Sequence, residues 1–537
     1  MKKNLCFFPF LILIMLHIRA QPPVLQWEKQ KALSSGKLLA HTTEGNIVVC
    51  GTYGNDYPGD WVNIITIMYD TNGTELWTRI YDDTINGGID DPWDMVIDTF
   101  DNIYIAGRTH LSYSGLPITS EVLILKYKKN GNLIWKQEFG DSVNFQGSAY
   151  KMRLVQNRNI YIAGYGQLIS GGQNKSIIAK YDSSGQFLWV NVDTNTYETI
   201  GLNVEVDKSE NIYLIGTTAC CVPGYKMFVS KYDSSGNNLW NTNIYDSSHI
   251  YATTHCSVID DSANIYIAGS TKDTAFSTGY DCVIAKVDSA GYQKWFTVYN
   301  SSSDPQNWED SKNIVFDSFR NIYVSGTVGT GNGGYAFILK VLGNGFISWN
   351  HVYNNPPSNA NGFTSLSLNS NHKIIATGGG DFGGISQGLT IISFDSTGQE
   401  NWRIEKQGDY SGNATIAGYN SLYVTGAKSN IDPQPIDDSL FLFKYSDSLI
   451  DFVTPSLFLY NSITVYPNPS IQFLKISIDK KINKLLELNI YDVNGRLIFV
   501  KNISSDFIIS TSEWCKGIYF IHLKLGDYTL TKKIIKQ

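Results

Sequence analysis

Short apolar runs follow one another along most of the chain, separated by residues that favour turns. Within residues 90–140 these runs are Asp94–Asp98, Ile103–Arg108, Val122–Tyr127 and Leu133–Phe139. The segment Asn-Ile-Tyr-Ile-Ala-Gly is apolar at both alternating sets of positions, which is typical of a strand whose sheet is covered on both sides. The pattern therefore predicts an all-β fold in which four-stranded sheets pack face to face.

Two signatures repeat at nearly constant spacing. The first, Asn-Ile-Tyr-x-x-Gly, has five close and three looser copies that end at Gly51, Gly107, Gly164, Gly216, Gly269, Gly326, Gly378 and Gly426, 48 to 57 positions apart. The second, Lys-Tyr-Asp-x-x-Gly-x-x-x-Trp, has seven relatives that end at Trp77, Trp135, Trp189, Trp240, Trp295, Trp349 and Trp402. Such a period, with four strands in each repeat, predicts the radially arranged blades of a β-propeller.

The two ends of the repeat region complement each other. After Ser446 the last repeat lacks its Trp-bearing fourth strand, whereas Leu25–Glu28 looks like a fourth strand without the preceding three. We expect Trp27 to complete the sheet of residues 413–446, because a closed ring removes exposed sheet edges. The sequence thus predicts an eight-bladed propeller closed by an N-terminal strand, with seven blades as the alternative.

The repeated side chains are predicted to serve the scaffold. A tryptophan at one fixed place in each repeat is expected to pack between blades. The repeated aspartate, as in Asp182 and Asp233, is expected to close a hairpin by accepting a hydrogen bond from a backbone N–H two residues on. Lys128 and Leu342 replace it in two copies, which a turn tolerates and a metal site would not.

The N-terminus predicts export from the cytoplasm. Two lysines, an apolar run from Leu5 to Leu16 and a small residue at Ala20 form a secretory signal peptide. We therefore assign residues 1–20 to the signal peptide, 21–453 to the propeller and 454–537 to a C-terminal segment. No part of the chain after the signal contains the run of about 18 apolar residues that a transmembrane helix needs.

Charge narrows the range of partners. Residues 21–453 contain 28 Lys and Arg against 43 Asp and Glu. An acidic body repels phosphate backbones, so nucleic acid is not an expected partner. Residues 454–537 reverse this balance, with 11 Lys and Arg against six Asp and Glu.

The C-terminal segment has its own motifs. Alternating apolar positions and turn residues predict about seven short strands, a small Ig-like sandwich. Its landmarks are Tyr466-Pro467-Asn468-Pro469, Tyr491–Arg496, Gly517-Ile518-Tyr519 and the lysine-rich end from Lys532. In this order they resemble the C-terminal sorting domain of the type IX secretion system.

The resemblance implies a route and a destination. It implies a Gram-negative member of the Bacteroidetes, passage through the periplasm, and recognition of residues 463–537 by the type IX machinery. The protein would then be secreted or held at the outer-membrane cell surface. Residues 25–450 resemble bacterial β-propeller repeat proteins that share both signatures, and this second resemblance implies only a scaffold.

One mouth of the ring is the predicted ligand site. The longer loops, between second and third strands, and the segments that enter each first strand should crowd the same face. Their carboxylates and aromatic rings suit glycan stacking or cation binding. The candidates are Asp56, Tyr57, Asp60, Trp61, Asp91, Trp93, Tyr280, Asp281, Trp308 and Asp381.

The sequence predicts binding rather than catalysis. It contains no nucleophile elbow, zinc-protease motif or phosphate-binding loop. We therefore expect a scaffold that binds an extracellular glycan or envelope protein, without a cofactor; calcium has no supporting motif. The alternative is a propeller enzyme, such as a carboxylate-based glycan hydrolase or lyase.

Pyrroloquinoline-quinone dehydrogenases offer a weaker enzymatic resemblance. They are eight-bladed, repeat an Ala-x-Asp-x-x-x-Gly-x-x-x-Trp motif, and some carry adjacent cysteines like Cys220 and Cys221. Here Asp and Gly are three positions apart, as in Asp182 and Gly185, which argues against that cofactor family. Cys220 and Cys221 could pair with Cys256 or Cys282, or with each other; loop thiols or one ordinary bridge are the alternative.

Overall fold

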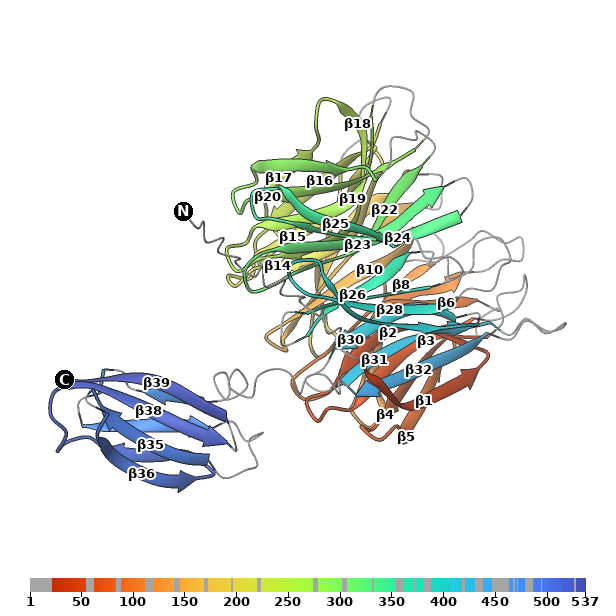
Figure 1. Cartoon of the computed structure of the whole chain (residues 1–537). Coiled ribbons are helices and arrows are strands. Elements are labelled where there is room, and N and C mark those ends of the chain that lie inside the picture. The colour runs from red at the N-terminus through yellow and green to blue at the C-terminus, as the bar shows by residue number, and fades with distance from the viewer. Residues whose placement is uncertain are drawn as a thin grey trace, which may run out of the picture. The chain divides into compact units, whose positions relative to one another are not determined.

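The computed structural model contains two compact units, Met1–Ser446 and Asp447–Gln537 (Figure 1). It describes residues 22–54, 62–83, 88–111, 120–139, 145–168, 172–194, 197–219, 224–273, 279–301, 307–330, 333–353, 362–369, 373–379, 388–408, 410–417, 421–429, 438–446, 463–466, 469–470, 472–478, 486–493, 495–525 and 528–537. Every regular element in these ranges is a strand, and none of them holds a helix suited to crossing a membrane. The predicted signal peptide lies outside them.

The described strands of the first unit form eight four-stranded antiparallel sheets. The first sheet contains β2(Ser34–His41), β3(Ile47–Tyr53), β4(Asn63–Tyr69) and β5(Glu75–Tyr81), and the second contains β6(Ile89–Ile97), β7(Ile103–Leu111), β8(Glu121–Tyr127) and β9(Leu133–Phe139). The third contains β10(Phe145–Val155), β11(Asn159–Leu168), β12(Lys175–Asp182) and β13(Phe187–Val192). The fourth contains β14(Thr199–Val206), β15(Ile212–Thr218), β16(Lys226–Tyr232) and β17(Asn238–Ile244).

The other four follow the same order until the last. They are β18(His249–Ile259), β19(Ile265–Asp273), β20(Asp281–Val287) and β21(Gln293–Tyr299); β22(Trp308–Phe316), β23(Ile322–Thr330), β24(Gly333–Val341) and β25(Ile347–Tyr353); β26(Phe363–Leu368), β27(Ile374–Gly378), β28(Leu389–Phe394) and β29(Glu400–Lys406); and β30(Tyr410–Ala417), β31(Ser421–Lys428) and β32(Ser439–Ser446) with β1(Val24–Ala32). We number these sheets blades 1 to 8 in the order of their first strands.

The first strands touch one another in a closed cycle. β2 contacts β6, each later first strand contacts the next, and β30 contacts β2. The first strands therefore surround the axis of a β-propeller. The middle strands are buried on both faces, as six of seven residues in β4 are, whereas the outer strand β5 exposes part of its length.

Blade 8 joins strands from the two ends of the first unit. β1 pairs antiparallel with β32, with Trp27 opposite Lys444, which confirms the predicted closure by an N-terminal strand. Ser34 in blade 1 donates its N–H to the carbonyl of Asp438 in blade 8 at 3.1 Å. Opening this ring would break a complete strand pairing and expose two edges.

The repeated tryptophan packs between neighbouring blades, as predicted. Trp77 lies against Gly131 of the next blade, where a Cβ would come within 2.7 Å of the indole. Its Nε1–H donates to the Lys129 carbonyl at 2.9 Å. Trp27 makes the same contacts across the closure, against Gly73 and the Thr71 carbonyl, the latter at 3.3 Å.

The repeated polar residues close hairpins. The Asp98 carboxylate accepts hydrogen bonds from backbone N–H groups two and four residues on, from the Asn102 amide and from the Tyr104 hydroxyl. This explains the Asn and Tyr of the first signature. Asp182 accepts from N–H groups two and four residues on, both at 2.9 Å, which is the turn chemistry predicted for the second signature.

The second unit is a two-sheet structure. One sheet contains β33(Ile463–Tyr466), β34(Phe473–Ile478) and β37(Phe507–Ser510); the other contains β36(Leu497–Ile503), β35(Leu486–Asp492), β38(Gly517–Leu525) and β39(Tyr528–Lys536). Side chains from both sheets, including Ile476, Leu488 and Ile521, share one buried core. Two sheets around one core form a sandwich.

Trp27→Ala should destabilise the propeller by about 2–3 kcal/mol, because a half-buried indole and its inter-blade contacts are lost. Trp135→Ala removes an equivalent indole between internal blades and is the matched control. We expect Trp27→Ala to accelerate unfolding more, since Trp27 belongs to the strand that closes the ring. Urea-jump unfolding followed by circular dichroism measures both rates, and equal acceleration would contradict a special role for the closure.

Candidate functional site

Each first strand of the eight blades carries a β-bulge at the same place. The bulge follows the residue that pairs with the glycine of the first signature; in blade 2, Pro92 pairs with Gly107. A Cβ on Gly107 would lie 2.1 Å from the Asp91 carbonyl oxygen, and the other seven glycines give 1.7 to 2.0 Å. Glycine is therefore required wherever the bulged strand presses against its partner.

The bulge leaves one extra residue in each strand beside the axis. These eight residues, termed the axial ring, are Lys37, Trp93, Tyr150, Leu202, His255, Lys312, Thr364 and Asn413. Asn413 donates its amide N–H to the Gly36 carbonyl at 2.8 Å. His255 donates from Nδ1 to the Ser311 carbonyl at 2.9 Å. In both pairs the acceptor immediately precedes the ring member of the next blade.

An aromatic patch occupies the part of the ring in blades 2 and 3. Trp93 is 40% exposed, and Tyr150 meets it edge-on with ring centres 5.2 Å apart. Tyr165 stacks on Tyr150 at 5.7 Å. Lys37 and Arg108 lie 5.8 and 5.7 Å from the Trp93 ring centre. The patch of Trp93, Tyr150 and Tyr165 thus has two cations beside an accessible indole.

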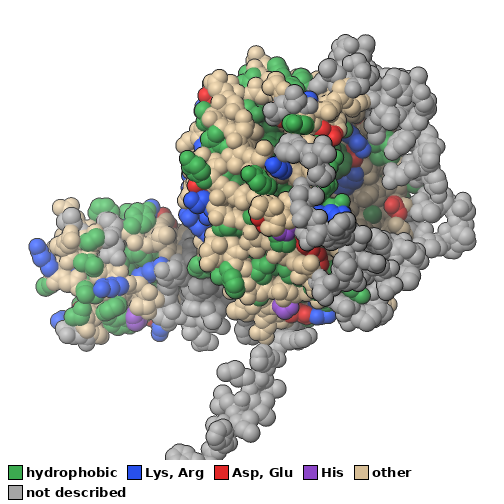
Figure 2. Space-filling view, turned by 90° about the horizontal axis from the view of Figure 1, so that it is seen from above, with side chains coloured by type: hydrophobic (Ala, Val, Ile, Leu, Met, Phe, Trp, Pro, Cys, Tyr) green, Lys and Arg blue, Asp and Glu red, His purple; other side chains and the backbone are tan. Residues whose placement is uncertain are grey.

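The ion pairs around this patch share one orientation. Lys37 binds Asp91 at 2.5 Å, with side chains 36% and 9% exposed. Lys151 binds Asp94 at 3.0 Å, with 32% and 9% exposed. In blades 3 and 4, Arg153 and Glu205 pair at 3.0 Å, with 30% and 4% exposed. In each pair solvent reaches the cation more readily than the carboxylate. Figure 2 shows charged side chains of both signs in a hollow of the propeller unit.

A second charged cluster lies on blades 5 and 6. Asp310 pairs with His255 Nδ1 at 2.8 Å and with Lys312 at 2.6 Å. Burial alone would raise the pKa of Asp310, but the His255 hydrogen bond and the charges of His255 and Lys312 lower it to about 2. Burial raises the pKa of neighbouring Glu309, although that carboxylate accepts hydrogen bonds from Ser301. Glu309 is only 1% exposed, so a ligand would not contact it.

The predicted site residues fall into three groups. Asp91 and Trp93 belong to the aromatic patch and its ion pairs. Tyr280 contacts Tyr251, with ring centres 5.3 Å apart, and its carbonyl accepts the Glu309 N–H at 2.6 Å. Trp308 lies across Gly329, and half-buried Asp281 begins β20. Asp56, Tyr57, Asp60, Trp61 and Asp381 lie outside the described residues.

The axial ring was missed by sequence reasoning, apart from Trp93. Lys37, Tyr150 and His255 vary from repeat to repeat, and each lies within a strand of the structure rather than a loop. The signal that could have found them is the signature glycine itself, because glycine inside a strand often marks a bulge opposite.

The predicted cysteine pairing stays a prediction. Cys256 and Cys282 are free thiols, and burial raises the pKa of both, that of Cys256 to about 12. Cys220 and Cys221 lie outside the described residues. Within the described ranges, no cluster of three His, Cys, Asp or Glu side chains could hold a metal ion.

Asp310→Asn should lower the melting temperature at pH 7, because the pair with His255 and Lys312 is lost. A carboxylate with a depressed pKa stabilises the folded state above its unfolded pKa of about 4, and that contribution disappears as pH falls toward 2. The difference between variant and parent should therefore shrink between pH 4 and pH 2. Calorimetry across this window measures it; a constant difference would mean that Asp310 acts through packing.

Comparisons with known proteins bear on the tail and on the fold. The family model described as a secretion system C-terminal sorting domain matches residues 464–537. No curated protein matches the chain.

Three solved structures illustrate the remote likeness of the propeller. The β-propeller domain of the Trilobed protease from Pyrococcus furiosus is 10% identical, covers 70% of this chain and 95% of its own, and has a TM-score of 0.35. The polysaccharide lyase Uly1 is 8% identical over 66% of this chain and 90% of its own, with a TM-score of 0.39. The Hadza microbial sialidase Hz136 is 10% identical, covers 72% of this chain and 73% of its own, and has a TM-score of 0.34.

Likenesses of this degree say nothing about what this chain binds or cleaves. The tail match confirms the sorting domain that the motifs predict, and that domain directs a protein to secretion or to the cell surface. Together with the ring of four-stranded sheets, it identifies the chain as an exported β-propeller that carries a C-terminal sorting domain of the type IX secretion system.

Proposed function

We propose that this protein binds an acidic glycan outside the cell, at the aromatic patch of the axial ring. The observation that carries the proposal is the exposed indole of Trp93, with Lys37 and Arg108 beside it. An aromatic face packs against the apolar face of a sugar ring. Cations at its edge can bind a carboxylate or sulfate on that sugar.

The orientation of the ion pairs supports an anionic ligand. Asp91 and Asp94 are both 9% exposed, whereas Lys37 and Lys151 are 36% and 32% exposed. A ligand that approaches along the axis therefore meets ammonium groups before carboxylates. Each buried carboxylate also holds its cation in place, which lowers the entropy lost when a ligand binds. The local charge pattern thus differs from the acidic average of residues 21–453.

Binding fits the described carboxylates better than cleavage does. Glycoside hydrolysis needs two carboxyl groups placed on either side of one glycosidic bond, one of them able to donate a proton. The carboxylates beside the aromatic patch are buried behind cations, and Asp310 has a pKa of about 2. A protein of the cell envelope is the alternative ligand, and the indole flanked by cations favours a glycan.

Trp93→Ala should weaken binding of an acidic polysaccharide about tenfold, because the stacking face is lost. Binding is measured by calorimetry with alginate, polygalacturonate and chondroitin sulfate, each beside a neutral polymer. Phe319→Ala removes an aromatic ring that is 75% exposed in the hairpin between β22 and β23, and it should have no effect. Affinity should fall as salt is added.

Several outcomes would count against this function. Equal binding of neutral and acidic polymers would show that Lys37 and Arg108 do not select an acidic glycan. Unchanged affinity in Trp93→Ala would show that the aromatic patch is not the binding site. A hydrolase or lyase would form new reducing ends or unsaturated sugars. If the parent forms them and Trp93→Ala does not, the protein is an enzyme rather than a binding protein.

Deletion of residues 455–537 should leave the propeller in the periplasm, because the signal peptide still directs export across the inner membrane while the sorting domain is gone. Cell fractionation and immunoblotting measure the distribution. The full chain with Trp93→Ala should reach the surface like the parent, which separates sorting from ligand binding. Surface display of the truncated chain would contradict the sorting assignment.

A further inference from the structure

The fourth strands of the blades differ at one position that fills the space between neighbours. Four residues after the repeated tryptophan stand Tyr81, Phe139, Ile244, Tyr299 and Tyr353 in blades 1, 2, 4, 5 and 6. Tyr81 donates its hydroxyl to Glu138 of the next blade at 3.0 Å. Phe139 stacks on Phe187 of blade 3, with ring centres 6.2 Å apart. A large apolar side chain therefore seals these outer interfaces.

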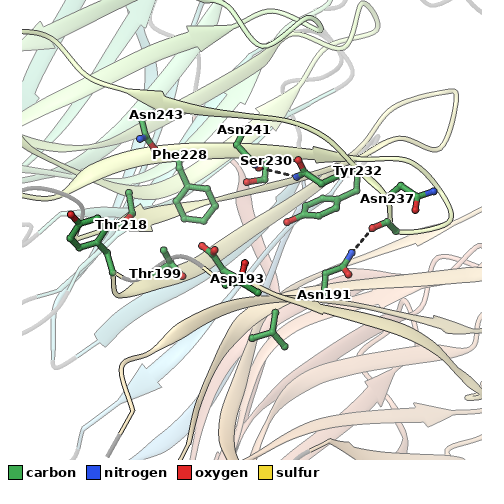
Figure 3. A pocket seen from close by; sticks show the side chains of 15 residues that line it. Asn191, Asp193, Thr199, Thr218, Phe228, Ser230, Tyr232, Asn237, Asn241 and Asn243 are labelled. Atoms are coloured by element: carbon green, nitrogen blue, oxygen red, sulfur yellow. Dashed lines mark hydrogen bonds between the residues drawn. The ribbon is translucent and has the colours of Figure 1, made fainter.

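Blade 3 has Asp193 at this position. Beside it, a groove of about 650 Å³ opens between β13 and the outer strands of blade 4 (Figure 3). Figure 3 shows Asp193 and Asn191 on one side and Phe228, Tyr232 and Asn241 on the other. The volume lies within the range of about 300–1,000 Å³ that is usual for small-molecule sites. The groove thus lies at the position where blades 1, 2, 5 and 6 carry an aromatic ring and blade 4 an isoleucine. The corresponding residues of blades 7 and 8 are Lys406 and Lys31.

The lining is polar, uncharged except at Asp193, and partly aromatic. Five asparagines line the groove, at positions 191, 237, 238, 241 and 243, together with the hydroxyls of Thr199 and Ser230. An asparagine amide both donates and accepts hydrogen bonds, as a sugar hydroxyl does. The rings of Phe228 and Tyr232 offer apolar surface beside them. No Lys, Arg or His is among the described residues of the lining, which disfavours phosphate, sulfate or uronate.

The position of Asn241 varies among the blades. The residue after the repeated tryptophan is Asn241 in blade 4, but Thr78, Lys136 and Phe296 in blades 1, 2 and 5. Asn241 and Asn238 exchange two hydrogen bonds, at 2.9 and 3.2 Å, so their amide planes are oriented. Asn191 donates to the Gly236 carbonyl across the interface, which is the inter-blade bond that Thr242 and Thr297 make to the corresponding glycines. The groove is therefore lined by oriented amide groups, and the position of Asn241 carries asparagine in one other blade, as Asn350 of blade 6.

From this groove and its lining, we propose a second binding site, specific for a neutral saccharide of one or two rings. Asp193 and the asparagines would hydrogen-bond the sugar hydroxyls, and Phe228 and Tyr232 would contact the apolar face of the ring. The site lies at the outer edge of blades 3 and 4, away from the axial ring. It is independent of the acidic-glycan site and has the opposite charge preference.

The experiment is saturation-transfer NMR on the full-length secreted chain, with methyl glycosides of glucose, galactose, mannose and N-acetylglucosamine, and with cellobiose and maltose. Asp193→Tyr places in blade 3 the side chain found in three other blades and should fill the groove. We expect at least one neutral sugar to bind the parent, and Asp193→Tyr to weaken its affinity at least tenfold. Asn241→Ala removes one amide and should weaken it about fivefold.

Two control variants locate the effect. Asn350→Ala changes the equivalent residue of blade 6 and should leave sugar affinity unchanged. Trp93→Ala should also leave it unchanged, which separates this site from the axial ring. The proposal is overturned if none of the six sugars binds the parent, or if Asp193→Tyr and Asn241→Ala bind as the parent does. If Asp193→Tyr does not fold, the sugar affinities of Asn241→Ala and Asn350→Ala are compared instead, and equal affinities overturn the proposal.

Discussion

The contact between a glycine in each second strand and a carbonyl oxygen of the first strand governs both the scaffold and its axis. A Cβ at these eight glycines would lie 1.7 to 2.1 Å from that oxygen, a distance no side chain could accept. The absence of a side chain lets the first strand bulge toward its partner. Because the bulge adds one residue beside the axis in every blade, the same glycine that tightens the sheet also positions the axial ring.

Repetition and variation have separate roles in this chain. The tryptophan, the hairpin aspartate and the signature glycine recur because every blade needs the same turns and the same inter-blade packing. The residues available to a ligand are those that do not recur. Trp93 stands where other blades carry lysine, leucine or threonine, and Asp193 stands where four other blades carry an aromatic ring.

The charge exposed at the aromatic patch differs from that at the groove beside Asp193, and the total charge of the chain does not show this difference. The overall charge of −7 averages over residues that never meet one ligand. At the aromatic patch, carboxylates are buried and cations are more exposed, so the accessible charge is positive. At the outer groove, one carboxylate and five amides form the lining. The two proposed sites therefore differ in charge preference although they belong to one ring.

The sequence alone determined the features that repeat or that depend on neighbouring residues. The period predicted the four-stranded sheets, Trp27 predicted the closure, and Asp182 predicted its own hairpin, because each signal lies within a short stretch or recurs at fixed spacing. The landmarks near Tyr466, Tyr491 and Tyr519 likewise identified the sorting domain. Asp91 and Trp93 were also singled out, although as loop residues, whereas the structure places them in a bulged first strand.

Only the tertiary structure decided which residues meet. Lys37 and Tyr150 lie more than 50 positions from Trp93 or from each other, and nothing in their local sequence marks them, because a bulge is defined by pairing register between two strands. The groove beside Asp193 is lined by residues of two neighbouring blades. Distances between segments remote in sequence arise only when the ring closes, so no reading of one repeat at a time could have located either site.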